Sequence, residues 1–159
     1  MTQELSRSAR KVQDVLSALG IESQVVELPA TTRTAADAAA AIGCSVAQIA
    51  KSLVFRTVSG KKPVMVIASG PNRVNEARIA ELIGEPIEKA DADYVRQKTG
   101  FSIGGVPPVG HPEPIRTIVD EDLLRLGEIW AAAGTPNSVV RLTAARLLEM
   151  TAGTAEAIK

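Results

Sequence analysis

The segment Ser52-Leu-Val-Phe-Arg-Thr-Val58 is followed, after the turn Ser59-Gly-Lys-Lys62, by the segment Pro63-Val-Met-Val-Ile-Ala68. Two apolar runs rich in β-branched residues, joined by a short turn that contains glycine, predict a β-hairpin over residues 52–68. Both runs are apolar on both faces, which is typical of strands that are covered on both sides. We therefore expect this hairpin to occupy a central position in a sheet.

Helical and strand patterns alternate on both sides of the hairpin. Thr34 precedes an alanine-rich run in which Asp37 stands at the third helical position, so Thr34 is expected to cap a helix. Asn75 and Thr143 precede two further helical runs in the same way. The whole pattern predicts helices over residues 5–19, 35–42, 76–83, 90–98 and 144–150, with further strands over residues 24–28, 115–119, 128–132 and 139–142.

No linker, composition shift or internal repeat divides the chain. Apolar residues make up 45% of its 159 residues and aromatic residues only 3%, so the core is expected to be aliphatic and closely packed. A chain of this length is typical of one domain. The sequence therefore predicts a single α/β domain over residues 1–159, with a mixed β-sheet surrounded by helices.

Composition also limits the class of function. Lys plus Arg and Asp plus Glu are balanced at 18 each, whereas a dedicated duplex-binding protein usually has a basic excess. With one cysteine, Cys44, and one histidine, His111, neither an internal disulfide nor a Cys/His metal cluster is expected, and a carboxylate-only metal site has no motif. No signal peptide or membrane-spanning run is visible. We expect a cytoplasmic protein without a metal, a cofactor or membrane association.

One stretch is too specialised for an ordinary connection. Thr99-Gly-Phe-Ser-Ile-Gly-Gly-Val-Pro-Pro-Val-Gly-His111 holds four glycines and two prolines between a predicted helix and a predicted strand. Gly104 and Gly105 would let a ligand approach the backbone and would expose consecutive N–H groups to an oxyanion or a phosphate. The alternative is a tight loop that only covers the sheet. The spacing matches no dinucleotide fingerprint, P-loop or nucleophile elbow.

This loop resembles the glycine loop of the YbaK/ProX family, the aminoacyl-tRNA deacylases related to the editing domain of bacterial prolyl-tRNA synthetase. Three further segments also resemble the family, and they occur in order over nearly the whole chain: Leu28-Pro-Ala-Thr-Thr-Arg-Thr-Ala-Ala-Asp37, Ile49-Ala-Lys-Ser-Leu-Val-Phe55 and Gly134-Thr-Pro-Asn-Ser-Val-Val-Arg-Leu-Thr143. The resemblance implies a partly barrel-like mixed sheet and hydrolysis of the ester in mischarged tRNA, without a metal or a protein nucleophile. The substrate it implies is tRNA for proline carrying Ala, 2-aminobutyrate, Cys or another small amino acid.

The resemblance makes Lys51 the counterpart of the family's key lysine. Its compact ammonium could contact the terminal adenosine and its phosphate or orient the attacking group. Without the resemblance, Lys51 would be an ordinary surface lysine at the start of a strand. Backbone N–H groups around residues 103–105 would hold the oxyanion, which makes Gly104 and Gly105 candidate catalytic positions beside Lys51.

The remaining candidates are substrate-binding residues, and each also has a purely structural alternative. Thr34 is implied at the mouth of the amino-acid pocket but is also a helix cap. His111 is expected to close the loop by hydrogen bonding rather than to act as a base, and a triad with Ser102 is disfavoured. Turn residues around position 136 are weaker candidates. The assigned set is Thr34, Ser102, Ile103, His111, Thr135, Asn137 and Val139.

Substrate preference and partners follow from the same resemblance. The branch that clears cysteine carries an acidic residue on the strand that here reads Ser138-Val-Val-Arg141, so Val139 and Val140 favour an aliphatic substrate such as alanine or 2-aminobutyrate. Zero net charge predicts weak, salt-sensitive binding of tRNA, which prolyl-tRNA synthetase or an elongation factor could strengthen. The cations expected near tRNA are Arg33, Lys51, Lys61, Lys62, Arg73 and Lys98.

Two other classes of function stay open. One is a non-catalytic nucleic-acid-binding module with the same fold, against which the balanced charge and the few aromatic residues argue. The other is a small-molecule ester hydrolase that uses the same glycine loop. It would differ from an editing enzyme in not needing the tRNA part of the substrate.

Overall fold

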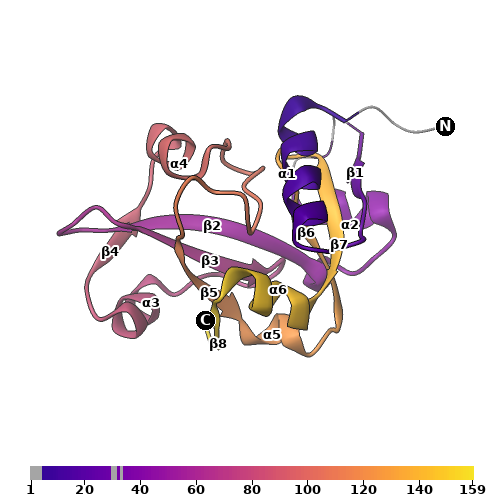
Figure 1. Cartoon of the computed structure of the whole chain (residues 1–159). Helices are drawn as coiled ribbons and strands as arrows, with labels where there is room; N and C mark the ends of the chain where they lie inside the picture. The colour runs from indigo at the N-terminus through magenta and orange to yellow at the C-terminus, as the bar shows by residue number, and fades with distance from the viewer. Residues whose placement is uncertain (1–4, 30–31, 33) are drawn as a thin grey trace.

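The computed structural model describes residues 5–29, 32 and 34–159 (Figure 1). The described helices are α1 (Arg7–Ala18), α2 (Ala35–Ile42), the 3-10 turn η1 (Val46–Gln48), α3 (Glu76–Ile83), α4 (Ala92–Thr99), α5 (Glu121–Leu124) and α6 (Ala144–Thr151). The described strands are β1 (Val25–Glu27), β2 (Ile49–Thr57), β3 (Pro63–Ser69), β4 (Ile87–Lys89), β5 (Arg116–Asp120), β6 (Glu128–Ala132), β7 (Ser138–Thr143) and β8 (Thr154–Glu156).

All eight described strands belong to one mixed sheet in the order β1-β7-β6-β2-β3-β5-β8, and β4 pairs with β2 beside this path. Antiparallel ladders join β2 to β3 and to β4, and join β7 to β1 and to β6. Parallel ladders join β2 to β6, β3 to β5 and β5 to β8. The predicted α/β fold with a mixed sheet is confirmed, and the β2–β3 hairpin lies in its interior.

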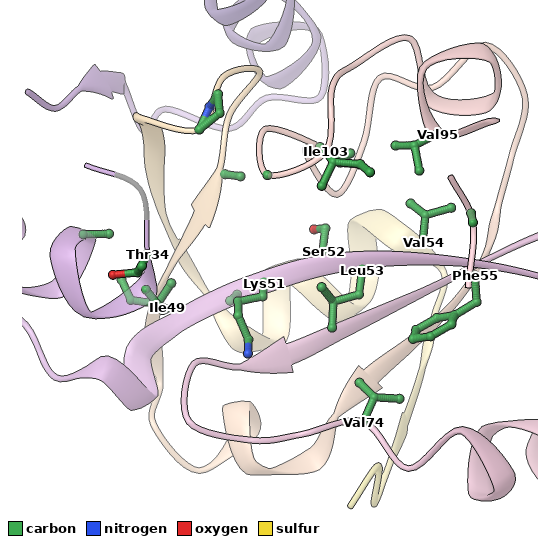
Figure 2. Close-up of a pocket in the computed structure, with 18 of the residues that line it drawn as sticks. Thr34, Ile49, Lys51, Ser52, Leu53, Val54, Phe55, Val74, Val95 and Ile103 are labelled. Carbon is green, nitrogen blue, oxygen red and sulfur yellow. The ribbon is translucent and has the colours of Figure 1, made fainter. Parts of the chain in front are cut away.

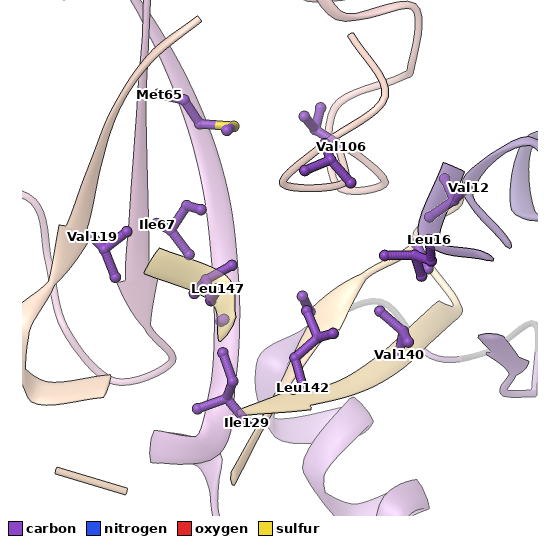
Figure 3. Packing of buried hydrophobic residues seen from close by; sticks show 14 of the residues in the cluster. Val12, Leu16, Met65, Ile67, Val106, Val119, Ile129, Val140, Leu142 and Leu147 are labelled. Atoms are coloured by element: carbon purple, nitrogen blue, oxygen red, sulfur yellow. The ribbon is translucent and has the colours of Figure 1, made fainter. Parts of the chain in front are cut away.

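The two faces of the hairpin are buried against different helices because successive strand residues point to opposite faces. Met65 and Ile67 of β3 join the large aliphatic core, which also contains side chains of α1, β6, β7 and α6 (Figure 3). Val64 and Val66 join a second cluster with Ile79 of α3. Figure 1 shows α3 on the side of the hairpin opposite to α4, in agreement with these clusters. Burial on both faces explains the doubly apolar pattern of the sequence.

Helix starts follow the predicted caps. Thr34 and Asp37 form a capping box at the start of α2, in which Thr34 Oγ1 accepts the N–H of Asp37 at 3.0 Å. Asn75 caps α3 and Thr143 caps α6, as the sequence predicts. The helix predicted from residue 90 starts at Ala92 instead, because the side chain of Asp91 accepts the N–H of Tyr94 and caps it there.

The sequence pattern does not predict the shortest helices and strands. The strands β4 and β8 have three residues each and α5 has four, which is too short for a visible periodicity. The sequence pattern starts β2 at Ser52, whereas the strand begins at Ile49, because residues 49 and 50 pair with the distant strand β6 and residues 50 and 51 pair with the end of β3. No described helix combines the length and the apolar character that crossing a bilayer requires.

Candidate active site

A cavity of about 670 Å³ opens around β2, in the size range of small-molecule sites (Figure 2). Its walls come from β2, the start of α2, the segment before α3, the glycine loop, β6 and the β6–β7 turn. Apolar side chains predominate in the lining. These apolar lining residues include Leu53, Val54, Val95, Ile103, Trp130 and Val139.

Lys51 lines this cavity and is half-buried on β2. Its Nζ donates to the backbone carbonyl oxygen of Asn72 at 3.4 Å, and no described carboxylate lies within ion-pairing range. Figure 2 shows Lys51 and Leu53 on the face of β2 opposite to Ser52 and Val54. The lysine thus keeps donors available for a ligand at the edge of the strand.

The charged lining of the cavity is mainly basic. Lys51, Arg73 and Lys89 are the lining cations, and Glu76 is the lining carboxylate, among the residues that the structure describes. None of these cations forms an ion pair with a described acidic group. A ligand with negative charge, such as a phosphate of a terminal nucleotide, suits this arrangement.

The glycine loop contributes Ile103, Gly104 and Val106 to the cavity, and not Gly105. Ile103 is 55% exposed at the mouth, and Gly104 has a φ of +89°, with atoms of Pro136 3.7 Å from a hypothetical Cβ. No acceptor for the backbone N–H of either residue is found within the described chain. Both amides are therefore available to an anionic or carbonyl oxygen.

Gly105 has a different position. It is buried, its N–H donates to the carbonyl of Ser102 at 3.0 Å, and its carbonyl accepts the N–H of Gly134 at 3.0 Å. A Cβ at this position would lie 2.7 Å from the Cα of Thr135. The structure thus places Gly105 in the packing of the loop against the β6–β7 turn, outside the lining of the cavity.

Ser102 and His111 also lie outside the lining. Ser102 Oγ accepts from Arg96 at 3.0 Å on the exposed surface. His111 Nε2 lies 2.8 Å from the carbonyl oxygen of Pro107, which closes the loop as expected. Burial lowers the pKa of His111 below its ordinary value of 6.5, and nearby Lys11 acts in the same direction against the Pro107 contact.

Polar residues of the β6–β7 turn hold this turn together. Thr135 Oγ1 contacts Asn137 and Ser138, and Asn137 Nδ2 donates to the carbonyl of Leu28 at 2.8 Å. Thr135 and Asn137 do not line the cavity, whereas the neighbouring Val139 does. Thr34 lines it at the start of α2 while serving as a cap.

The cations expected near tRNA are only partly gathered at the cavity. Lys61 pairs with Glu88 at 2.8 Å, and Lys98 lies 5.8 Å from the centre of the Tyr94 ring. Lys62 is exposed on the β2–β3 turn, away from the lining residues. Arg33 lies outside the described residues. Lys51 and Arg73 are therefore the expected cations that reach the cavity.

A buried acid behind Lys51 was not visible as a site in the sequence. Asp120 is 1% exposed and accepts the N–H of Ser69 at 3.0 Å and the side-chain amide of Asn72 at 2.7 Å. Asn72 also donates to Asp122. This hydrogen bond and the one from Lys159 lower the pKa of the Asp122 carboxyl. These bonds hold the Asn72 segment, whose carbonyl receives Lys51. The only local signal was a carboxylate at the end of an apolar strand.

Comparisons with known proteins agree with this architecture. Residues 29–150 match the model of the family described as "Aminoacyl-tRNA editing domain". The chain belongs to the aminoacyl-tRNA editing domain family. The matched region covers β2, the glycine loop and the β6–β7 turn, and so includes the described walls of the cavity.

Two relatives differ in how much of their own length matches this chain. The chain is 31% identical over 128 residues to the uncharacterised protein YwhH of Bacillus subtilis (strain 168), covering 80% of this chain and 81% of that protein. It is 31% identical over 117 residues to the proline–tRNA ligase of Xanthomonas campestris pv. campestris (strain 8004), covering 73% of this chain. The match spans only 20% of the ligase.

Among solved structures, a proposed trans-editing enzyme for prolyl-tRNA synthetase superposes with a TM-score of 0.94 at 46% identity. The superposition covers 98% of this chain and 99% of that one. The predicted family resemblance is therefore confirmed. In the described part of this editing domain, no three His, Cys, Asp or Glu side chains gather as a metal ion would require.

Proposed function

We propose that this editing domain hydrolyses the ester bond of mischarged tRNA, acting on tRNA for proline that carries a small aliphatic amino acid. One observation carries the proposal: a lysine without an ion pair and two backbone amides without an acceptor, within the described chain, line the same cavity. An aminoacyl ester is already activated, so positioning of a water molecule and stabilisation of the oxyanion suffice for hydrolysis.

The amides of Ile103 and Gly104 receive the oxyanion that forms when water attacks the ester carbonyl. The bond from the carbonyl carbon to the ribose oxygen then breaks, and the ribose oxygen takes up a proton. The products are the free amino acid and tRNA with its terminal hydroxyl restored. Neither a metal nor a protein nucleophile takes part in these steps. Fixed backbone dipoles serve this purpose well because they need no reorganisation during the reaction.

Lys51 binds the terminal nucleotide, with Arg73 beside it. The side chain of Lys51 extends on the face of β2 opposite to Ser52 and Val54 (Figure 2), and Asn72, which accepts its ammonium, directly precedes Arg73. An ammonium with three donors suits a ribose hydroxyl and a phosphate oxygen. The terminal nucleotide is thus held by cations while the acyl group extends across the edge of β2.

The amino-acid side chain binds among Val54, Val95 and Val139. The side chains of these residues line the cavity and offer neither charge nor hydrogen bonds. Such a wall suits alanine or 2-aminobutyrate better than the more polar cysteine or serine. Because one methylene changes binding by only about 1–3 kcal/mol, discrimination among small aliphatic residues is modest. The reaction takes place in the cytoplasm, and prolyl-tRNA synthetase or an elongation factor supplies further affinity for tRNA.

The experiment is deacylation of tRNA for proline charged with Ala, 2-aminobutyrate, Cys, Ser or Pro, with and without EDTA. A matched panel of aminoacyl methyl esters tests the need for tRNA. We expect hydrolysis of Ala and 2-aminobutyrate pairs, sparing of Pro, no effect of EDTA and no activity on the methyl esters. Equal activity on the methyl esters would indicate a small-molecule ester hydrolase. Binding of tRNA without hydrolysis of any pair would indicate a non-catalytic module.

A further inference from the structure

The strand β2 is paired completely on one side and incompletely on the other. The strand β3 pairs with it continuously from Ala50 to Arg56. On the opposite side, β6 pairs only with residues 49 and 50, and β4 pairs only with residues 55–57. Residues 51–54 therefore have no partner strand on this side within the described chain. This gap is an open sheet edge inside the cavity wall.

Two hydrogen bonds at the end of β2 show which residues face the gap. Thr57 donates its N–H to the carbonyl of Lys62 at 2.9 Å, toward the side of β3. Val58 donates its N–H to the carbonyl of Pro86 at 3.0 Å, toward the side of β4. Backbone groups of successive strand residues alternate between the two sides. Even-numbered residues of β2 therefore face the side of β4 and β6.

Ser52 and Val54 consequently direct their backbone N–H and C=O groups into the gap, because the register from residue 50 to residue 56 is uninterrupted. No loop or side chain of the described residues hydrogen-bonds to these groups. Unpaired backbone groups at the wall of a cavity are a binding surface for a ligand that completes their hydrogen bonds, since native proteins rarely leave such groups unpaired.

The side chain of Ser52 adds a second, independent observation. Its Oγ is buried and has no hydrogen-bond partner within the described chain. Native proteins rarely leave a buried hydroxyl unpaired, and such groups gather where a ligand completes the bonding. Figure 2 shows Ser52 and Val54 on the face of β2 toward Ile103, on the acyl side of the proposed site.

We propose that this open edge binds the α-amino group of the aminoacyl ester, through the carbonyl oxygen and the hydroxyl of Ser52. The inference rests on the proposed function and extends it. An ammonium has three donors and no acceptor, and these two oxygens are acceptors in the cavity that the oxyanion amides also line. The edge therefore restricts the substrate class to esters with a free amino group, and excludes N-acylated and peptidyl-tRNA.

The test compares tRNA for proline carrying alanine, N-acetylalanine or lactate, in which a hydroxyl replaces the amino group. Each enzymatic rate is divided by the spontaneous hydrolysis rate of the same ester, because blocking or removing the amino group changes the intrinsic reactivity. We expect the normalised rate to fall by about 10- to 100-fold for N-acetylalanine and for lactate, the scale of a lost hydrogen bond to a charged group. Equal normalised rates would overturn the assignment.

Two variants distinguish recognition from packing. Ser52→Ala removes an unpaired hydroxyl, so it should leave the thermal stability intact, lower the normalised rate for the alanine ester by about tenfold and leave the N-acetylalanine ester unaffected. Ser52→Thr keeps the hydroxyl and should restore the preference for the alanine ester. Equal effects of Ser52→Ala on both esters would overturn the role of Ser52.

The failures of the two proposals are distinguishable. Hydrolysis of the alanine and N-acetylalanine esters at equal normalised rates would contradict the amino-group site but not the proposed deacylase activity. Hydrolysis of neither ester overturns both.

Discussion

The glycine loop contains two halves that differ in their surroundings. Residues 103 and 104, the cavity-facing half, are exposed, and both offer the cavity backbone amides that have no described acceptor. Residues 105–109, the packed half, are buried against the β6–β7 turn and the main core. The packed half fixes the position in which the cavity-facing half presents its donors.

The adjacent glycines show the difference most clearly. Gly105 is required because its neighbour Thr135 leaves no room for a side chain. Gly104 has room, with Pro136 atoms 3.7 Å from a hypothetical Cβ, but its φ of +89° disfavours any other residue. One glycine therefore serves packing and the other serves backbone conformation at the cavity. Stability and deacylation should respond differently to changes in the two halves.

The largest effect is expected for Gly105→Ala in the packed half. The added methyl would overlap backbone atoms of Thr135, so we expect a loss of about 2–3 kcal/mol in the free energy of unfolding, with deacylation lost as the loop shifts. Urea unfolding measures the loss. Gly60→Ala is the control, because a Cβ there would make only ordinary contacts. Equal stability of the two variants would show that the packed half tolerates displacement.

A smaller loss of stability and a clear loss of deacylation are expected for Gly104→Ala. The positive φ should cost about 1–2 kcal/mol, and the displaced amides should slow deacylation by about 10- to 100-fold. Gly127→Ala has the same kind of backbone strain, with a φ of +74° and open space, outside the cavity lining. If the control slows single-turnover deacylation as much as Gly104→Ala does, the loss reflects stability alone.

Ile103→Ala should affect the substrate and not the fold. The side chain is 55% exposed, so its truncation should change the free energy of unfolding by less than about 0.5 kcal/mol. Loss of apolar contact at the mouth should lower kcat/KM for the alanine ester by roughly tenfold. Leu19→Ala, at a side chain that is 50% exposed at the C-cap of α1 and outside the cavity lining, is the control. An unchanged kcat/KM for Ile103→Ala would remove Ile103 from the acyl site.

The smallest effect concerns pH and the packed half. Burial lowers the pKa of His111, so below its ordinary value of 6.5 the unfolded chain binds a proton that the folded chain does not. Stability should therefore decrease as the pH falls below 6.5, and His111→Gln should lack this decrease. Lys61 and Arg56 lower the pKa of Glu88 below its ordinary value of 4.5, so this carboxyl also makes stability depend on pH. Urea midpoints should therefore be measured above pH 4.5. Parallel pH profiles for the two proteins would contradict the assignment.

Local chemistry made much of the fold predictable. The hairpin, the caps at Thr34, Asn75 and Thr143, and the loop closure by His111 each depend on residues close in sequence. Pairings between distant segments were not predictable, and they include the start of β2 on β6 and the strands β4 and β8.

The candidate site was predictable as a set of segments and not as a set of atoms. Sequence pattern could not separate Gly104 from Gly105, because the difference comes from Thr135, thirty residues farther along the chain. It also could not show the open edge at Ser52, which exists only because β4 and β6 stop short of it. Both features arise from tertiary contacts.

Hydrolysis of mischarged tRNA in the cavity at Lys51 is the proposal on which the others depend. Its most direct test is single-turnover deacylation of alanine on tRNA for proline by wild type, Lys51→Ala and the exposed control Lys62→Ala, with thermal unfolding of the same samples. We predict a loss of about 100-fold or more for Lys51→Ala alone, with unchanged stability, because its ammonium makes one long contact in the folded protein. A wild-type rate in folded Lys51→Ala would contradict the claim.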